Sequence, residues 1–181
     1  MKKEKTDNVN HNVNRKTQEL VNSLKDKDKI KILFVCLGNI CRSPAAQGVF
    51  QSVVDAHDDT RFYVDSAGTG DWHIGDLPDK RMRVHANRRG YDLTHRARQF
   101  RPTDFDDFDL ILVMDESNRR NVANMAQTPQ DEIKIVPMAS FLSDRSHYDH
   151  IPDPYYEGSE GFELVLDLLE DSAQNLYNQL K

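Results

Sequence analysis

Apolar residues are distributed along the chain in two distinct patterns. In the first pattern they form short, nearly continuous runs rich in β-branched residues, which is typical of strands buried on both faces of a sheet. In the second pattern they recur every three or four positions, which predicts helices with one apolar face. The continuous runs occupy residues 30–36, 61–68, 109–114 and 132–138. The helical pattern occupies residues 43–55, 78–90, 116–126 and 160–180.

The two patterns alternate, so that each predicted strand is followed by a predicted helix. This order favours βαβ units with right-handed crossovers and therefore a parallel sheet. We expect an α/β fold with three layers, in which a four-stranded parallel sheet is flanked by helices. Ligands of such folds bind at the carboxyl ends of the strands. The polar segment 142–158 is too long for a simple connection, and long loops of this kind are often functional.

Charge divides the chain at about residue 29. Residues 1–29 carry a net charge of +3 and residues 30–181 a net charge of −9. We interpret residues 1–29 as a flexible basic N-terminal extension that is mostly disordered, with one or two helical turns around "QELVNSL", and residues 30–181 as the functional domain. The acidic domain argues against nucleic-acid binding. Because no apolar run approaches a membrane span and no secretory signal is present, we expect a cytoplasmic protein that does not bind membranes.

Both cysteines lie in one short loop with the sequence "VCLGNICRSP". The first predicted strand ends at Cys36, and the following helix begins near Ser43. Between them, Gly38 and Asn39 can both adopt a positive φ angle, which permits a tight turn. Backbone N–H groups converge in such a turn, and the N-terminus of the helix adds positive potential. The loop is therefore expected to form a cradle for an anion, with Cys36 at its floor.

The residues around this cradle predict phosphoryl transfer without a metal ion. The planar guanidinium of Arg42 can bind two oxygens of a tetrahedral oxyanion at once. The donors that hold the oxyanion would also stabilise a thiolate on Cys36, which is then placed for in-line attack on phosphorus. Ser43 can donate its hydroxyl proton to the cysteine sulfur. A single buried cysteine is usually only a small apolar residue, but here it stands in phase with Gly38, Arg42 and Ser43.

At this point the sequence resembles a known family, the low-molecular-weight protein tyrosine phosphatases. "VCLGNICRSP" is similar to the active-site loop of that family, and "DPYY" at 153–156 resembles its general-acid segment. Three further stretches match the family in order and approximate spacing, namely "DSAGT" at 65–69, "ARQF" at 97–100 and "MDESN" at 114–118. The resemblance covers about residues 31–181. It implies a four-stranded parallel sheet with the phosphate-binding loop after the first strand.

The resemblance also implies a reaction and a set of site residues. Cys36 would attack phosphorus and form a phosphocysteine while Asp153 protonates the leaving phenol, and Asp153 would then activate water for hydrolysis. Phosphotyrosine-containing proteins would be the substrates, and no metal or other cofactor is implied. The phosphate-binding loop would comprise Leu37, Gly38, Asn39, Ile40, Cys41, Arg42 and Ser43. Supporting and cleft residues would be Ser66 and His95, which hold Asn39, and the aromatic side chains of Trp72, Tyr155 and Tyr156.

Several other residues have plainer interpretations. Asp115 is expected to cap the helix that follows it. His147, His150 and Asp149 are interpreted as exposed loop residues and not as a metal site. Cys41 lies close enough along the loop to form a disulfide with Cys36, so the enzyme is expected to be redox-sensitive.

Three alternative functions stay open on the same loop. The first alternative is an arsenate reductase, which has a similar loop. Its reaction resembles a relay through a third, distant cysteine, which this chain lacks. The second alternative is a phosphoarginine phosphatase, a related branch whose loop resembles this one but has threonine at the position of Ile40. A non-catalytic phosphotyrosine-binding module would need a disrupted Cys36, Arg42 or Asp153, and all three are present.

We expect a monomer or a weakly self-associating protein.

Overall fold

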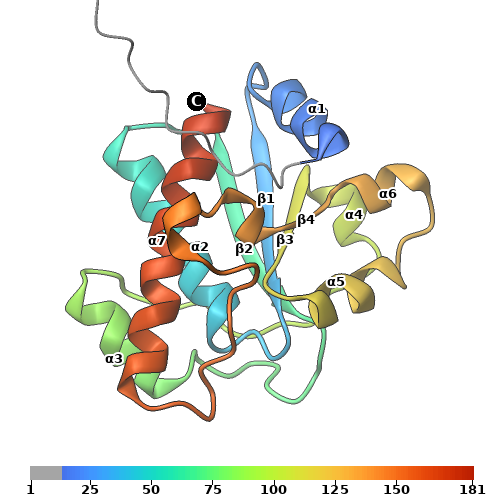
Figure 1. Cartoon of the computed structure of the whole chain (residues 1–181). Coiled ribbons are helices and arrows are strands. Elements are labelled where there is room, and N and C mark those ends of the chain that lie inside the picture. The colour runs from blue at the N-terminus through green and yellow to red at the C-terminus, as the bar shows by residue number, and fades with distance from the viewer. Residues whose placement is uncertain (1–13) are drawn as a thin grey trace, which may run out of the picture.

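The computed structural model describes residues 14–181, and its centre is a sheet of four parallel strands in the order β2-β1-β3-β4 (Figure 1). Each neighbouring pair is parallel, and β1 pairs along its whole length with β2. The predicted α/β fold with a four-stranded parallel sheet is therefore confirmed. The strands are β1 (Ile30–Cys36), β2 (Phe62–Gly68), β3 (Leu110–Val113) and β4 (Ile135–Pro137).

Helices cover both faces of the sheet and complete the three layers. Figure 1 shows one group of helices against one face and a second group of shorter helices against the other. The first group is α2 (Arg42–Ala56), α3 (Lys80–Arg88) and α7 (Ser159–Leu180). The second is α4 (Asp104–Asp107), α5 (Glu116–Ala123) and α6 (Pro129–Ile133). Two short 3-10 helices, η1 (Met138–Phe141) and η2 (Asp144–Ser146), lie between β4 and α7.

The alternation of side chains along β1 creates two cores. Ile32 and Phe34 belong to the cluster formed with the first group of helices, whereas Leu33 and Val35 belong to the cluster on the opposite face. Successive side chains of a strand point to opposite faces, so a strand in the middle of three layers is apolar wherever both faces are covered, as β1 is from Ile32 to Cys36. This explains the continuous apolar run. Within residues 14–181, no helix has both the length and the apolar character that crossing a bilayer requires.

The N-terminal region differs from the expected flexible extension. Residues 15–24 form helix α1 (Arg15–Leu24), whose Val21 and Leu24 are buried in the larger core. The side chain of Asn14 caps this helix by accepting a hydrogen bond from the backbone of Thr17. The short amphipathic stretch therefore gains its stability from the apolar surface beneath it, which local sequence does not reveal. Residues 1–13 lie outside the described residues, and their flexibility stays a prediction.

The boundaries after β3 also differ from the sequence expectation. The strand predicted for 132–138 is shortened to β4 because residues 129–133 form α6. Thr128 caps that helix by accepting a hydrogen bond from Asp131 N, and Pro129 occupies its first position. Threonine before proline is a helix-start signal that competes with the strand pattern.

Candidate active site

The loop between β1 and α2 forms at the carboxyl end of the central strand. Asn39 adopts the left-handed conformation with φ of 55°, as the sequence suggested. Gly38 does not adopt a positive φ. It matters instead for space, because a Cβ atom at this position would lie 3.1 Å from Cδ2 of His73.

The loop presents backbone donors that have no partner in the protein. Among the described residues, no backbone acceptor or side chain receives a hydrogen bond from the N–H groups of residues 38–41. Helix α2 begins immediately afterwards at Arg42, so its positive N-terminal end lies at the same point. Cys36 is buried beneath this turn. The arrangement is an anion cradle with a thiol at its floor.

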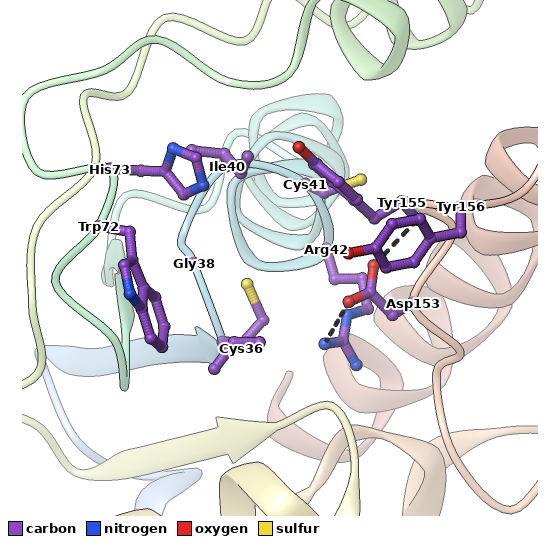
Figure 2. Close-up of a pocket in the computed structure, with 11 residues that line it drawn as sticks. Cys36, Gly38, Ile40, Cys41, Arg42, Trp72, His73, Asp153, Tyr155 and Tyr156 are labelled. Atoms are coloured by element: carbon purple, nitrogen blue, oxygen red, sulfur yellow. Dashed lines mark hydrogen bonds and ion pairs between the residues drawn. The ribbon is translucent and has the colours of Figure 1, made fainter.

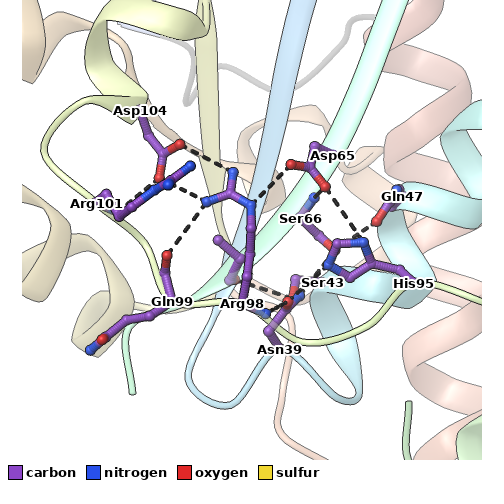
Figure 3. A network of polar contacts seen from close by, with 11 residues as sticks. Asn39, Ser43, Gln47, Asp65, Ser66, His95, Arg98, Gln99, Arg101 and Asp104 are labelled. Carbon is purple, nitrogen blue, oxygen red and sulfur yellow. Dashed lines mark hydrogen bonds and ion pairs between the residues drawn. The ribbon is translucent and has the colours of Figure 1, made fainter. Parts of the chain in front are cut away.

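A buried network holds the strained residue of the loop (Figure 3). The Asn39 side-chain nitrogen donates to Ser43 Oγ at 2.8 Å and to Ser66 Oγ at 3.0 Å. Its oxygen accepts from the backbone N of Arg98 at 2.9 Å and lies 3.0 Å from Nε2 of His95. The N–H of Arg98 can only donate, so the oxygen is an acceptor and His95 Nε2 must carry a proton. Ser66 and His95 thus contact Asn39 as expected.

The same network sets the state of the groups beside the thiol. Cys36 Sγ lies 3.0 Å from Ser43 Oγ. Ser43 accepts a hydrogen bond from Asn39, and its own proton has two acceptors within reach, the sulfur at 3.0 Å and the carbonyl of Ala67 at 3.4 Å. Burial lowers the pKa of His95, against the opposing effect of Asp65, so this imidazole is neutral near neutral pH. A neutral His95 serves as a hydrogen-bond donor to the loop and not as a second cation.

Arg42 is held from one side only. Its Nη1 donates to Asp115 Oδ2 at 2.6 Å and to the carbonyl of Ile151 at 3.0 Å. Nη2 lies 3.6 Å from Asp153 Oδ2, and neither Nη2 nor Nε makes a hydrogen bond within residues 14–181. Burial works to lower the pKa of Arg42, but Cys36, Asp115 and Asp153 outweigh it and raise the pKa above the ordinary value. The guanidinium is therefore fixed, charged and still able to donate to an oxyanion.

Asp115 has two roles, of which the sequence indicated one. It caps α5 by accepting a hydrogen bond from Asn118 N at 2.9 Å, and the Asn118 side chain returns a contact to the Asp115 backbone. This agrees with the expected helix cap. Its second oxygen orients Arg42, which lies 73 positions away in the sequence.

The cradle opens into a cavity of about 250 Å³ (Figure 2). Figure 2 shows Trp72 and His73 on one side of the opening, with Asp153 and Tyr155 on the other. Trp72 is 70% exposed and Tyr156 is 95% exposed, so both form the rim and not the floor. The lining residues are Cys36, Leu37, Gly38, Ile40, Cys41, Arg42, Trp72, His73, Asp153, Tyr155 and Tyr156.

His73 is the lining residue that sequence reasoning missed. It follows the expected cleft residue Trp72 directly, and it packs over the bare backbone of Gly38. Its Nδ1 lies 3.2 Å from Asp76 Oδ2. The only signal in the sequence was this adjacency, because nothing local indicates that the loop carrying Trp72 folds over the phosphate loop.

Asp153 projects towards the cavity from the long loop before α7 (Figure 2). Its side chain is 44% exposed, and Tyr155 N donates to its Oδ1 at 3.0 Å. The histidines of the same loop do not line the cavity. His150 lies 2.7 Å from exposed Asp149 and His147 is itself exposed, which agrees with their interpretation as surface residues.

A thiol below a cradle of backbone donors, with a fixed guanidinium and a carboxyl at the opening, is an arrangement suited to binding a tetrahedral oxyanion. Comparison with known proteins identifies the family. The family model for low molecular weight phosphotyrosine protein phosphatase matches residues 31–181. A Synechocystis protein named as a low molecular weight protein-tyrosine-phosphatase is 48% identical over 153 residues, which is 83% of this chain and 96% of that protein. This chain belongs to the low molecular weight phosphotyrosine protein phosphatase family.

Solved structures agree with this assignment. A protein tyrosine phosphatase from Entamoeba histolytica matches with a TM-score of 0.81 and 41% identity, over 84% of this chain and 97% of that one. An arginine phosphatase from Drosophila matches with a TM-score of 0.78 and 33% identity, over 84% of this chain and 98% of that one. The fold is therefore shared by phosphatases named for two different phosphorylated residues.

Proposed function

We propose that this chain hydrolyses phosphotyrosine in proteins through a covalent phosphocysteine on Cys36. The observation that carries the proposal is the placement of this thiol beneath free loop N–H groups and beside Nε and Nη2 of Arg42, which make no hydrogen bond within residues 14–181. These donors match the three equatorial oxygens on which charge is spread during phosphoryl transfer. The names of the relatives support phosphotyrosine as the substrate.

In the first step the Cys36 thiolate attacks phosphorus and the bond from phosphorus to the phenol oxygen breaks. Asp153 gives its proton to that oxygen, because a tyrosine phenol with a pKa of about 10 leaves poorly as a phenolate. In the second step Asp153 takes a proton from water, the water oxygen bonds to phosphorus, and the phosphorus–sulfur bond breaks. Inorganic phosphate and the free thiolate result. The Ser43 hydroxyl, 3.0 Å from the sulfur, stabilises that thiolate both before attack and on departure.

The cavity favours an aryl phosphate. Ile40, Trp72 and Tyr155 provide apolar and aromatic surface above the cradle. A flat phenol ring fills this space and brings its phosphate to the thiol. The stem of phosphoserine is too short to do so. Phosphotyrosine peptides should therefore exceed matched phosphoserine peptides by well over tenfold in kcat/KM.

Phosphoarginine is the second candidate because the Drosophila arginine phosphatase shares the fold. The apolar Ile40 at the cavity wall supports an aromatic ester over a guanidinium, which has donors to satisfy. Replacing Ile40 with threonine should move some activity towards phosphoarginine. No change in the ratio of the two activities would remove Ile40 as a determinant.

We also propose that Cys41 protects Cys36 from irreversible oxidation. Cys36 and Cys41 are both buried free cysteines. Burial, and then the negative charge of the nearby Cys36, raises the pKa of the Cys41 thiol well above its ordinary value, and the second of these causes disappears once Cys36 is oxidised to a neutral sulfenic acid. A sulfenic acid formed on Cys36 by peroxide can condense with this thiol, releasing water and forming a disulfide that a thiol reductant cleaves. Cys41→Ser should therefore lose reversible recovery after peroxide.

The decisive experiment replaces Cys36 with serine. We expect Cys36→Ser to lose turnover of an aryl phosphate while still binding inorganic phosphate, because the cradle is unchanged and a serine hydroxyl stays protonated. Turnover above about one hundredth of the wild-type value would reject the nucleophile, since removing a covalent nucleophile typically costs far more. The cytoplasmic location and the monomeric or weakly associating state remain predictions.

A further inference from the structure

The segment that carries the proposed general acid has few attachments to the rest of the protein. Upstream, the backbone of Ile151 donates to Met114 O at 2.8 Å. Downstream, Glu157 N bonds only to Pro154 O inside the same segment. The carboxylate of Asp153 takes its orientation from the N–H of Tyr155. The other oxygen of Asp153 lies 3.6 Å from Arg42 Nη2, so the acid has one contact in its own segment and one in the phosphate loop, and fixing Tyr155 fixes the first of them.

Arg81, in the first turn of α3, contacts the ring of Tyr155. Its guanidinium carbon lies 5.3 Å from the centre of that ring and 4.8 Å from the ring centre of Phe162. Both distances are within the range of cation–π attraction. Phe162 is buried at the start of α7, so one side of the guanidinium is placed against the core. Arg81 thus connects the acid segment to a rigid helix.

The position of Arg81 is in turn tied to the phosphate loop. Its Nε and Nη2 lie 3.2 Å and 3.0 Å from the two carboxylate oxygens of Asp79. The backbone N of Asp79 donates to the carbonyl of Ile40 at 2.6 Å. The hydrogen bonds to Asp79 also raise the pKa of Arg81, so the side chain is charged at any pH of interest. A continuous set of contacts therefore runs from Ile40 through Asp79 and Arg81 to Tyr155.

We propose that Arg81 is a positioning residue for the general acid: it holds Tyr155, and through the Tyr155 N–H the Asp153 carboxyl, at a fixed height above the phosphate loop. This inference rests on the proposed function. It adds a residue that does not touch the substrate and that lies outside the cavity lining. Because Arg81 acts through Asp153, it affects departure of the leaving group and leaves the affinity of the cradle for an oxyanion unchanged.

The test compares Arg81→Met with the control Arg83→Met. Methionine keeps an unbranched stem but removes both the charge and the hydrogen bonds to Asp79. Arg83 lies on the same helix and donates to Pro78 O, without an aromatic partner among the described residues. Arg81→Lys is the second variant, because it keeps a cation near the ring but cannot bind Asp79 through two nitrogens. The Arg81 side chain is 47% exposed, so we expect all three variants to fold, which thermal melting checks.

The readout is kcat/KM for two esters, one of tyrosine and one of a much more acidic phenol. A cation–π contact corresponds to roughly a three- to thirtyfold change in an equilibrium. We expect Arg81→Met to lose about fivefold to tenfold on the tyrosine ester and less than about twofold on the activated ester, within that range. Arg81→Lys should lose less, and Arg83→Met should keep the wild-type ratio. Inhibition by inorganic phosphate should be equal in all of them.

A double variant separates this proposal from the proposed function. In an Asp153→Asn background, Arg81→Met should cause no further loss on the tyrosine ester, because the group it positions is absent. If Asp153→Asn alone leaves the ratio of the two esters unchanged, the assignment of the acid fails. If Asp153→Asn changes that ratio but Arg81→Met does not, the acid stands and the role of Arg81 is rejected. Equal losses on both esters, or losses that add in the double variant, likewise reject it.

Discussion

Two arginines at opposite ends of the sheet make opposite use of their donors. Arg42 lies at the carboxyl end, where its side chain is 3% exposed, yet its Nε and Nη2 make no hydrogen bond within the described residues. Arg61 lies at the amino end just before β2, with 28% of its side chain exposed. All three of its nitrogens are used, on Asp59 and on the carbonyls of Lys25 and Leu180. The more buried arginine is the less satisfied one.

This difference in hydrogen bonding distinguishes an arginine of a binding site from an arginine that stabilises the fold. Burying a donor without an acceptor costs about 1–3 kcal/mol, and more for a charged group. In a stable fold the most buried polar groups therefore normally have hydrogen-bond partners. The nitrogens of Arg61 follow this rule. Arg42 departs from this rule because Asp115 and Ile151 accept hydrogen bonds from Nη1 alone, while Nη2 has only the more distant carboxylate of Asp153 at 3.6 Å. An oxyanion would supply the missing acceptors.

The same substitution at both arginines should separate the two roles most clearly. Arg42→Lys should lower kcat/KM for an aryl phosphate by about 10³-fold, because an ammonium cannot bind two phosphate oxygens in a plane. Its melting temperature should change little, since few hydrogen bonds of the folded protein depend on Arg42. Steady-state kinetics and a thermal scan on the same sample measure both. Near-normal kinetics would mean that Arg42 does not bind the phosphate.

Arg61→Lys should show the reverse result. The variant loses the paired contact with Asp59 and weakens the contacts to Lys25 and Leu180, which join α1 and α7 to the sheet. We expect the free energy of unfolding to fall by about 2–3 kcal/mol. The value of kcat/KM should stay within about twofold, because the cradle is built at the other end of the strands. Denaturant unfolding measures the first quantity, and a large loss of activity in the folded variant would contradict the separation.

The structure at the carboxyl end of the sheet could be predicted from the sequence more completely than the structure at the amino end. The cradle could be predicted because its parts are local: Cys36, Asn39, Arg42 and Ser43 all lie within one strand–loop–helix connection. The contact between Asp115 and Arg42 could not, since Asp115 approaches Arg42 only after β3 is placed beside β1. The position of His73 in the cavity lining could not be predicted for the same reason, because its loop meets Gly38 only in the folded chain.

The amino end was predicted least well. Val21 and Leu24 of α1 pack against a core that is assembled from distant elements, so their short amphipathic stretch gave no reason to expect a docked helix. The alternation of strands and helices nevertheless identified the α/β fold class, because it is repeated along the whole chain. Averaging over many residues makes such a pattern reliable, whereas a single docking contact has no such support.

The smallest expected effect concerns Asp59, the carboxylate partner of Arg61. Hydrogen bonds from Arg61, against an opposing effect of burial, lower the pKa of Asp59 from 3.8 to about 2, and the Tyr177 hydroxyl contributes a further bond at 3.1 Å. The folded state therefore binds this proton less readily than the unfolded chain. The resulting stabilisation is present above the unfolded value and is lost as the pH falls through the folded value.

Asp59→Asn should remove that part of the acid dependence. A difference of nearly two pKa units corresponds to about 2.4 kcal/mol before screening by solvent, which reduces it to about 2 kcal/mol or less. At neutral pH the variant should therefore unfold at a lower denaturant concentration than the wild type by an equivalent amount. Between about pH 4 and pH 2 the wild type should lose this advantage, and the two unfolding curves should converge. Asp58→Asn is the matched control, because Asp58 is the exposed neighbour with a φ of 50°, which asparagine tolerates. If wild type and Asp59→Asn instead stay a constant distance apart down to pH 2, the contact with Arg61 does not depend on the charge of Asp59, and the amino end is held by the carbonyl contacts alone.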